Sequence, residues 1–582
     1  QFVQPGSTSV ALNRVVGSDP SNIFGSLSSN GKVFLLNPNG VLFGQGAAVN
    51  VGGLVASTLA LSDANLMSGN YTFSGAGTGS VVNQGTINAA DSGFVTLLGA
   101  TVSNQGVISA QLGSVALAAG NAVTLDIAGD KLLNVHVTQG AVNALVENGG
   151  MLRADGGQVL MTTQTAASLL SNAVNNTGVV QAQTLQNIDG TIKLLGGMDT
   201  GTMAVGGKLD ASAPNGGKGG FIETSAAQVH VAPSVQVTTA AANGASGTWL
   251  IDPQDFVIGS APGNNIAGST LSAQLVTTSV TINTATGAGA ALPGNGDIFV
   301  NDAVSWTASG VPTTLSLIAV GDINVNAAVT ATEGNFVACC GGDVNVNAAI
   351  TTTRGSVLLG AERNVNVNAP ITTTDGNISI CAAEDIQIAD TITLTRGSTI
   401  PAQSLGLPVG LVLSAGYGDT GPGVTGGTVV FAPVGSTATV TGAVGTAVPV
   451  TINYNPSSYA TPTDYAPNFV LTDATLSQHM LVFPDGGGKA FDGTTTTTFT
   501  GLKGAPANVT LQGAGTANFD TAAVGVDKTI TFSGFSLGGA DAALYALPNV
   551  FPEQPAIQIS ANRGQVVDEV LQGRVEGALK GK

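Results

Sequence analysis

The chain of 582 residues has a formal net charge of −18, only 9% charged residues and 81 glycines. The acidic balance argues against nucleic acid or an anionic membrane as a partner. The scarcity of Glu, Lys and Arg argues against a helical protein, and no apolar stretch approaches the ~20 residues of a transmembrane helix. A chain this long would ordinarily form several domains unless it is a solenoid, whose core grows with its length.

Residues 1 to about 60 combine short apolar runs with turn residues. Among them, Asn37-Pro38-Asn39-Gly40 predicts a β-turn, because Pro fixes φ at the second position, Asn tolerates the third and Gly frees the fourth. This turn would direct the apolar strands on either side of it. The other runs are Ala-Leu-Asn-Arg-Val at 11–15, Ile-Phe-Gly at 23–25, Val-Phe-Leu-Leu at 33–36, Val-Leu-Phe-Gly at 41–44 and Gly-Gly-Leu-Val-Ala-Ser-Thr at 52–58.

Together these runs resemble the secretion domain of two-partner-secretion exoproteins, the filamentous haemagglutinin family. The resemblance implies that residues 1–150 pass through a dedicated outer-membrane barrel transporter, the expected partner, and nucleate a β-helix outside the cell. The protein would then be secreted, to the bacterial cell surface or the extracellular matrix. Family members carry further strands and a cap before the phrase matching Phe2-Val3-Gln4-Pro5. We therefore expect that the N-terminal cap is missing and that the precursor is longer.

Two roles stay open for the secretion motif, Asn37, Pro38, Asn39 and Gly40. The motif can serve only as a turn that aims two apolar strands. Alternatively, the transporter can contact it directly. The two roles are compatible, because a partner can also recognise a turn.

From about residue 80 the chain repeats. Asn83-Gln84-Gly85 recurs as Asn104-Gln105-Gly106, 21 residues later, and an apolar strand follows each copy. The motif weakens but persists at 152–157 and 176–178. We interpret the chain up to about residue 245 as one unbroken β-helix shaft, in which residues 151–247 follow the secretion domain.

Residues 248–470 are predicted to add further coils. Their first residues, Trp-Leu-Ile-Asp-Pro at 249–253, are similar to a junction phrase in large exoproteins of the same family, and we expect Trp249 to pack in the interior rather than to stack on a sugar. A repeat this short cannot bury its own core and must stack on its neighbours, which predicts an all-β chain wound as a right-handed parallel β-helix. One apolar position recurs every 21 residues, at Ile323, Val344, Val365 and Ile386.

The three cysteines are expected to be buried apolar thiols. Cys339 and Cys381 share a repeat phase but lie two repeats apart, which is about 9.6 Å along a stack of parallel strands. That separation exceeds the Cα distance that a disulfide allows. A bond between the neighbours Cys339 and Cys340 would be strained, so no disulfide is expected.

Beyond residue 470 the 21-residue phase is lost. Residues 471–550 resemble the YDG module, a small β-sandwich-like repeat of bacterial surface adhesins, through the module motif Phe491-Asp492-Gly493. The family usually has Tyr at the first position, so the ring is kept and a hydroxyl is lost. Residues 551–582 contain an alternating strand-like run at 556–560 and a charged tail, which together are a candidate inter-subunit contact.

Nothing in the sequence assembles a catalytic, cofactor or metal site. There is no HExxH, paired CxxC, GxSxG or phosphate loop. Asp252 and Asp255 could bind Ca²⁺, but no Ca²⁺-binding nonapeptide series accompanies them. The histidines are dispersed in the chain at His136, His230 and His479. We therefore expect that the protein is not an enzyme and holds no cofactor.

The favoured function is that of a rigid β-helical adhesin, and end-to-end polymerisation into fibres for cell attachment and biofilm is a further expectation. A polysaccharide-active β-helix enzyme is one alternative, but it would need clustered Asp, Lys or Arg side chains. The best-defined coils contain only Arg354 and Arg363 as basic residues, and we expect both at turns that face water. The other alternative is a carrier stalk for a toxin or a haem-binding effector.

Overall fold

The computed structural model describes residues 1–548 apart from 76, 78, 127–132, 165–172, 186, 285–293, 398–404, 419–420, 424–425, 434, 487–491, 520 and 524–529. The described residues form two compact units, Gln1–Ile318 and a second unit that begins at Ala319. Phe491 of the module motif lies outside the described residues, and so does the expected tail at 551–582.

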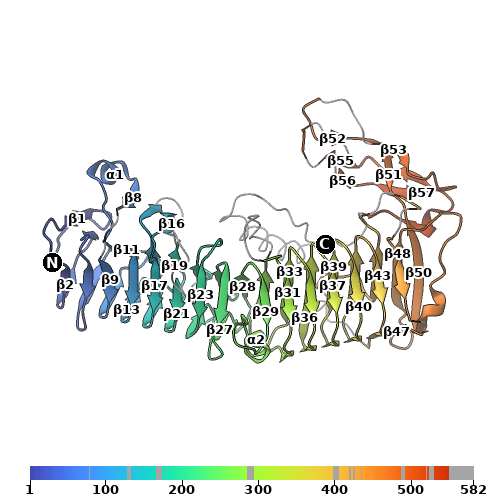
Figure 1. The fold of residues 1–582 in the computed structure, drawn as a ribbon, viewed down its shortest axis with the longest axis horizontal. Helices are drawn as coiled ribbons and strands as arrows, with labels where there is room; N and C mark the ends of the chain where they lie inside the picture. The colour runs from blue at the N-terminus through green and yellow to red at the C-terminus, as the bar shows by residue number, and fades with distance from the viewer. Residues whose placement is uncertain are drawn as a thin grey trace. The chain divides into compact units, whose positions relative to one another are not determined.

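The first unit is a parallel β-helix whose coils contribute strands to three sheets (Figure 1). Its first sheet contains β1 (Val10–Arg14), β4 (Lys32–Leu36), β7 (Gly53–Ser57), β11 (Phe94–Gly99), β14 (Ser114–Ala119), β19 (Gln158–Thr163), β22 (Thr191–Leu195), β25 (Phe221–Ser225), β28 (Thr248–Asp252) and β30 (Ser279–Asn283). Its second sheet contains β2 (Ser21–Ile23), β5 (Val41–Phe43), β9 (Ser80–Asn83), β12 (Thr101–Asn104), β17 (Leu145–Asn148), β20 (Val174–Asn176), β23 (Thr202–Val205) and β26 (Gln228–Val231). The third contains β3 (Ser26–Ser28), β6 (Ala48–Val51), β10 (Thr86–Ala89), β13 (Val107–Ser109), β18 (Met151–Arg153), β21 (Val179–Gln181), β24 (Lys208–Asp210) and β27 (Gln236–Thr238).

Successive coils of the first unit stack in parallel with like residues above like. In the first sheet, Val95 pairs with Leu54 on one side and with Val115 on the other, and Val115 pairs with Val159. All four side chains are fully buried. Because each coil is too small to close its own core, this apolar column is the core of the unit. The predicted parallel β-helix is confirmed.

Four buried asparagines form a hydrogen-bonded ladder along the second sheet. Each of the first three side-chain amides donates from Nδ2 to Oδ1 of the next asparagine, and all three N···O distances are 2.8 Å. None of the four is more than 1% exposed, so their amides satisfy one another in place of water. The ladder consists of Asn83, Asn104, Asn148 and Asn176, so the Asn-Gln-Gly repeat in the sequence marks two of its rungs.

The stack of coils in the first unit is continuous, as expected, but the chain leaves the coils in insertions that were not predicted from the sequence. Three strands leave the coils and form an antiparallel sheet that follows a short helix. Phe73 and Val123 of this sheet pack in one buried cluster with Phe34 and Val55 of the first sheet. The added elements are α1 (Asp63–Ser68), β8 (Tyr71–Ser74), β15 (Ala122–Asp126) and β16 (Asn134–Gln139).

The physical reason for this added layer is the composition of the strands beneath it. All residues of β11 and β14 are buried, on the outer face of the sheet as well as on the inner one. An apolar outer face must be shielded from water by another layer. Strands that are buried on both faces typically have a continuous run of apolar residues in their sequence. The antiparallel sheet provides that cover.

The last coils of the first unit carry a longer excursion. β29 (Phe256–Ile258) pairs in parallel with β31 (Ile298–Val300), and β30 pairs with β33 (Thr313–Ala319). The helix α2 (Gly268–Leu275) contacts β32 (Val304–Thr307). Trp249 in β28 is fully buried, and its indole N–H donates to Thr224 Oγ1 at 3.0 Å. The expected interior position of Trp249 is confirmed.

The second unit also winds as parallel coils, with strands side by side in Figure 1. One sheet contains β36 (Gly334–Cys340), β39 (Val357–Ala361), β42 (Ile378–Ala382), β45 (Leu411–Ala415), β48 (Val448–Tyr454) and β50 (Ala474–Leu481). Another contains β34 (Ile323–Val325), β37 (Val344–Val346), β40 (Val365–Val367), β43 (Ile386–Ile388) and β46 (Val429–Phe431). The third contains β35 (Val329–Thr332), β38 (Ile350–Thr353), β41 (Ile371–Thr374), β44 (Ile392–Thr395), β47 (Ala438–Thr441) and β49 (Phe469–Thr472).

The 21-residue repeat sets the register of this unit. Val344 pairs with Ile323 and Val365, and Val365 pairs with Ile386. All four are fully buried. The repeat therefore marks successive inward-facing positions, as predicted from the sequence.

The cysteines occupy the predicted places in the stack. Cys339 pairs with Gly360, which pairs in turn with Cys381, so the two thiols lie two coils apart. All three cysteines are free and buried. The expectation of buried thiols without a disulfide is confirmed.

A small module of antiparallel strands follows the last coil. Among the described residues, it consists of three small sheets, two with two strands and one with three strands. After them, β58 (Tyr545–Ala546) pairs in parallel with β50, so the chain returns to the edge of the coils. Val482, Leu502, Val509 and Leu547 form its buried core. Its other strands are β51 (Pro484–Gly486), β52 (Thr496–Thr497), β53 (Phe499–Leu502), β54 (Thr510–Gln512), β55 (Thr516–Phe519), β56 (Ile530–Ser533) and β57 (Ser536–Gly538), and it includes the short 3₁₀ helix η3 (Ala542–Leu544). The 3₁₀ helix η2 (Ala466–Asn468) lies in the coils, just before β49.

Candidate functional site, the Asn37–Gly40 turn

The secretion motif forms the turn between β4 and β5. The backbone N–H of Gly40 donates to the carbonyl of Asn37 at 3.1 Å, which closes a four-residue turn. Gly40 has a φ of +121°, a conformation that side chains rarely adopt. Pro38 and Asn39 occupy the two central positions, so the residue order matches the predicted turn.

Asn37 anchors this turn from inside the protein. Its side chain is fully buried, and its Nδ2 donates to the carbonyl of Asp19 at 3.0 Å and to Ser21 Oγ at 2.9 Å. Its Oδ1 accepts from the backbone N–H of Asn39 at 3.0 Å. A buried amide with all these partners is costly to replace, because an apolar side chain would leave them unpaired.

Neighbouring backbone holds the turn from both sides. A Cβ at Gly79 would lie 2.4 Å from the carbonyl carbon of Asn39, so the 79–80 loop packs directly on the turn. On the other side, Asn39 Nδ2 donates to the carbonyl of Gly17 at 2.8 Å. The turn is therefore fixed in position as well as in shape.

The motif has a buried half and an exposed half. Asn37 and Gly40 are buried, whereas Pro38 and Asn39 are exposed. Val16, next to Gly17, is 99% exposed. Pro38, Asn39 and Val16 thus present a surface with little charge on a rigid support. Only this half can touch a partner while the turn stays intact.

The module motif also forms a turn, as far as the structure describes it. Asp492 Oδ1 accepts from the backbone N–H and the hydroxyl of Thr494, both at 2.9 Å. Gly493 follows with a φ of +78°. The secretion motif belongs to the first unit and the module motif to the second, and each forms a local turn of its own.

The dispersed polar candidates have structural partners. Arg354 pairs with Glu333 of the previous coil at 2.6 Å, and Arg363 pairs with Asp322, two coils away, at 2.8 Å; both arginines are about half exposed. The predicted positions at water-facing turns are confirmed. Asp255 Oδ1 accepts two backbone N–H groups, from Gly296 and Asp297. Within the described ranges, no group of three or more His, Cys, Asp or Glu side chains could hold a metal ion.

The histidines do not converge. His136 is exposed in β16 and His230 is half-buried in β26. His479 lies in β50, where its Nδ1 is 3.0 Å from Asn453 Oδ1. Sequence reasoning missed this pair, and it also missed the packing of the 17–21 loop on the secretion motif. Neither carries a sequence signal, because the partners come from different coils.

The stacked parallel coils place the protein in the class of β-solenoid proteins. Residues 1–210 match the family model of the TPS secretion domain, and residues 484–553 match that of the YDG domain. Residues 1–210 therefore belong to the TPS secretion domain family, and residues 484–553 belong to the YDG domain family. A TPS secretion domain indicates that the protein is secreted.

Two relatives share part of the chain. A heme/hemopexin-binding protein of Haemophilus influenzae is 39% identical over 167 residues, which cover 26% of this chain and 18% of the relative. A second heme/hemopexin-binding protein of Haemophilus influenzae is 34% identical over 218 residues, 33% of this chain and 23% of the relative. The chain thus spans less than a quarter of the length of these relatives. Their names describe binding and not a reaction.

Among solved structures, the HMW1 secretion domain of Haemophilus influenzae is similar, with 23% identity and a TM-score of 0.35. The similarity covers 64% of this chain and 82% of that structure.

In the part of the chain that the structure describes, no helix combines the length and the apolar character needed to cross a membrane.

Proposed function

We propose that the chain is a rigid β-helical adhesin at the bacterial cell surface or in the extracellular matrix. The observation that carries this proposal is the in-register stacking of coils within each unit, which makes a stiff scaffold from local contacts. Side-chain ladders reinforce it: Asn345 Nδ2 donates to Asn324 Oδ1 at 3.0 Å, and Asn366 Nδ2 donates to Asn345 Oδ1 at 2.8 Å. A stiff scaffold suits a protein that holds a cell at a distance from its target.

Attachment of cells tests the adhesin proposal. Bacteria that secrete the chain through its transporter are expected to adhere to abiotic surfaces or to one another more than cells that lack the chain. The control is a strain that expresses the transporter alone. Equal adherence of the two strains would contradict the proposal.

The proposal includes the absence of catalysis. The arginines of the best-defined coils are engaged in ion pairs across coils, so they are not free to serve in acid–base chemistry. Incubation of purified protein with a panel of polysaccharides is expected to release no new reducing ends. Release of product at a rate proportional to protein concentration would favour the enzyme alternative.

We further propose that the exposed half of the secretion motif contacts the transporter and that the buried half only shapes the turn. Pro38→Arg is expected to lower secretion and to leave the folded protein as stable as wild type. Asn37→Ala is expected to lower stability as well, because it removes the three hydrogen bonds made by this buried amide.

Secreted yield and stability together separate these two roles. Secretion is measured as protein in the medium, and stability as the urea midpoint of the purified chain. Gln111→Arg is the matched control, since Gln111 is also an exposed turn residue of the first unit. Secretion of Pro38→Arg at the wild-type level would show that the turn acts only through its shape.

A second candidate function is the capture of haem, which the names of the two relatives support. Titration with hemin, followed by the Soret absorbance, tests it. A saturable spectral change at one site per chain is expected if the chain binds haem. A spectrum unchanged from that of free hemin would contradict haem capture and leave the adhesin function as the remaining proposal.

End-to-end association of identical subunits stays a prediction from the sequence. Its basis is general, since the end of a stack of strands presents unpaired backbone groups. Electron microscopy over a dilution series tests it. Short rods at every concentration would contradict association.

A further inference from the structure

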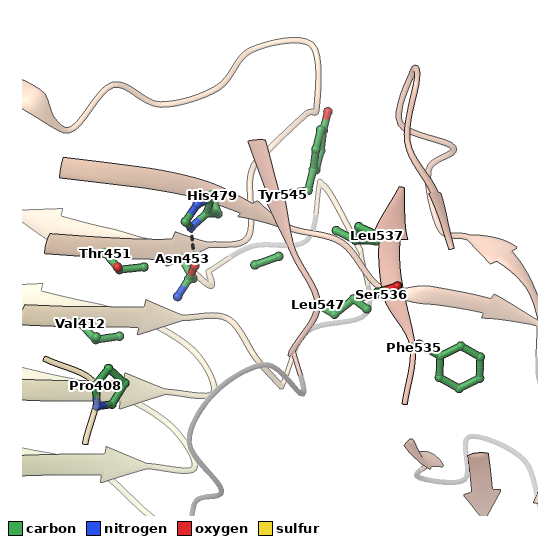
Figure 2. A pocket seen from close by; sticks show the side chains of 11 residues that line it. Pro408, Val412, Thr451, Asn453, His479, Phe535, Ser536, Leu537, Tyr545 and Leu547 are labelled. Carbon is green, nitrogen blue, oxygen red and sulfur yellow. Dashed lines mark hydrogen bonds between the residues drawn. The ribbon is translucent and has the colours of Figure 1, made fainter. Parts of the chain in front are cut away.

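A half-open cavity of about 420 Å³ lies in the second unit, between the coils and the antiparallel module (Figure 2). The coils contribute the outer faces of β45, β48 and β50, and the module contributes β57, β58 and the residues next to them. Its volume falls within the ~300–1,000 Å³ typical of small-molecule sites. Most of its wall is apolar, made by Pro408, Val412, Phe535, Leu537 and Leu547.

One side of this cavity carries a polar column. Ser414, Asn453 and His479 occupy paired positions on three successive coils. Asn453 Nδ2 donates to Ser414 Oγ at 3.0 Å, and Asn453 Oδ1 lies 3.0 Å from His479 Nδ1. Asn453 is 4% exposed, so this column is built into the fold and does not belong to the open surface. Figure 2 shows the bond between His479 and Asn453 on one side of the cavity, with Leu537 and Leu547 on the other.

The direction of these hydrogen bonds fixes the state of the imidazole. A carboxamide oxygen can only accept, so Nδ1 of His479 carries the proton and donates it to Asn453. Burial lowers the pKa of His479, which keeps the ring neutral at neutral pH. In a neutral imidazole with the proton on Nδ1, Nε2 carries a lone pair and acts as an acceptor.

The cavity therefore offers apolar walls and one strong acceptor. The other titratable side chain that lines it is Tyr545, whose pKa is raised by burial, so that its phenol stays protonated. We infer that the cavity binds a small aromatic molecule that carries a hydroxyl group, with the ring against Leu537 and Leu547 and the O–H donating to Nε2 of His479. This site is independent of the proposed adhesive function.

A pair of matched probes tests the inference on the purified full chain. 2-Naphthol carries the hydroxyl donor, and 2-methoxynaphthalene has the same ring system without a donor. Equilibrium dialysis is expected to show that 2-naphthol binds about five- to tenfold more tightly, the range that one neutral hydrogen bond supports. Equal affinities for the two probes, or no binding of either, would overturn the inference.

Two variants locate the binding. His479→Leu is expected to reduce the affinity for 2-naphthol to that for 2-methoxynaphthalene, whereas Ser477→Ala, an exposed position of the same strand, is expected to change neither. Leu537→Trp fills the cavity and is expected to abolish binding of both probes, with an unchanged circular dichroism spectrum as the control for folding. Preference for 2-naphthol that survives in His479→Leu, or binding that survives in a folded Leu537→Trp variant, would place the site elsewhere and refute the inference.

A pH series adds a readout that a merely structural role of His479 would not give. Protonation of Nε2 removes the acceptor, so the preference for 2-naphthol is expected to disappear as the pH falls below the lowered pKa of His479. Tyr545 does not titrate in that range, since its pKa is raised. A preference that is independent of pH down to the point of unfolding would contradict the role of His479.

Discussion

Replacement of Asn104 by Ala tests whether the buried amide ladder stabilises the first unit. Asn104 lies in the ladder between Asn83 and Asn148, and it accepts from one and donates to the other at 2.8 Å. In Asn104→Ala, Oδ1 of Asn148 has no donor among the described residues, which costs about 1–3 kcal/mol for a buried acceptor. Asn83 Nδ2 keeps only its longer contact with the carbonyl of Gly85, at 3.3 Å, and the bond that it loses is worth about 1 kcal/mol. The expected loss of unfolding free energy is about 2–4 kcal/mol.

The chain offers both a reporter and a matched control for this measurement. Trp249 and Trp306 are its only tryptophans, and both lie in the first unit, so tryptophan fluorescence during urea unfolding reports on that unit. Asn88→Ala removes a similar amide bond, 3.1 Å to Asn50, that is exposed to solvent. Water can replace that bond, so the expected loss is below about 1 kcal/mol. Equal losses for Asn104→Ala and Asn88→Ala would refute the argument that burial gives the ladder its energetic weight.

Three further predictions concern single side chains. Gly178→Ala is expected to destabilise the first unit strongly in urea unfolding, because a Cβ there would lie 2.2 Å from the carbonyl oxygen of Gly150 in the previous coil. Gly25→Ala is expected to be nearly neutral, because no atom lies within 4 Å of a Cβ at that position. Burial raises the pKa of Asp210, but hydrogen bonds from a lysine and a serine outweigh burial and hold the pKa below its usual 3.8. The ionised carboxylate therefore stabilises the fold fully above that value, and this stabilisation is lost as the pH falls through the lower pKa of the folded state. The stability difference between wild type and Asp210→Asn is expected to vanish in strong acid. Burial raises the pKa of Cys339 and Cys340 to about 12, so alkylation by iodoacetamide, followed by intact mass, is expected to be slow in the folded chain and fast in urea; rapid labelling of the folded chain would show that the thiols are accessible.

The coils could be predicted from the sequence because their geometry is periodic. A position that recurs every 21 residues, such as Val344 and Val365, returns to the same place on the next coil and pairs with its counterpart. The turn at Asn37–Gly40 was predictable for a different reason, since its conformation depends on four adjacent residues. In both features the interacting residues are related in the sequence, because they are either adjacent or separated by one repeat.

The parts of the structure that were not predicted depend on contacts between residues that do not occupy equivalent positions in the 21-residue repeat. The cover of the first sheet joins residues near 72 to residues near 124, and the column that ends at His479 spans coils of unequal length. The division of the secretion motif into a buried Asn37 and an exposed Pro38 depends on the 17–21 and 79–80 loops, which have no motif of their own. A search for periods cannot detect such partners.

One signal in the sequence could still have revealed the cover. A strand in a sheet with one buried face and one solvent-exposed face normally alternates apolar and polar residues. Ser-Val-Ala-Leu-Ala-Ala at 114–119 does not alternate and is buried throughout. Such a strand needs apolar partners on the side away from the core, and the nearest unassigned apolar residues lie just after it, at Val123 and Leu125. These two residues do pack on the outer face, in the same cluster as Ala116 and Ala118. In a β-helix, a loss of alternation within one strand therefore predicts an added layer over that strand, and the elements of that layer are to be sought among the insertions that interrupt the repeat.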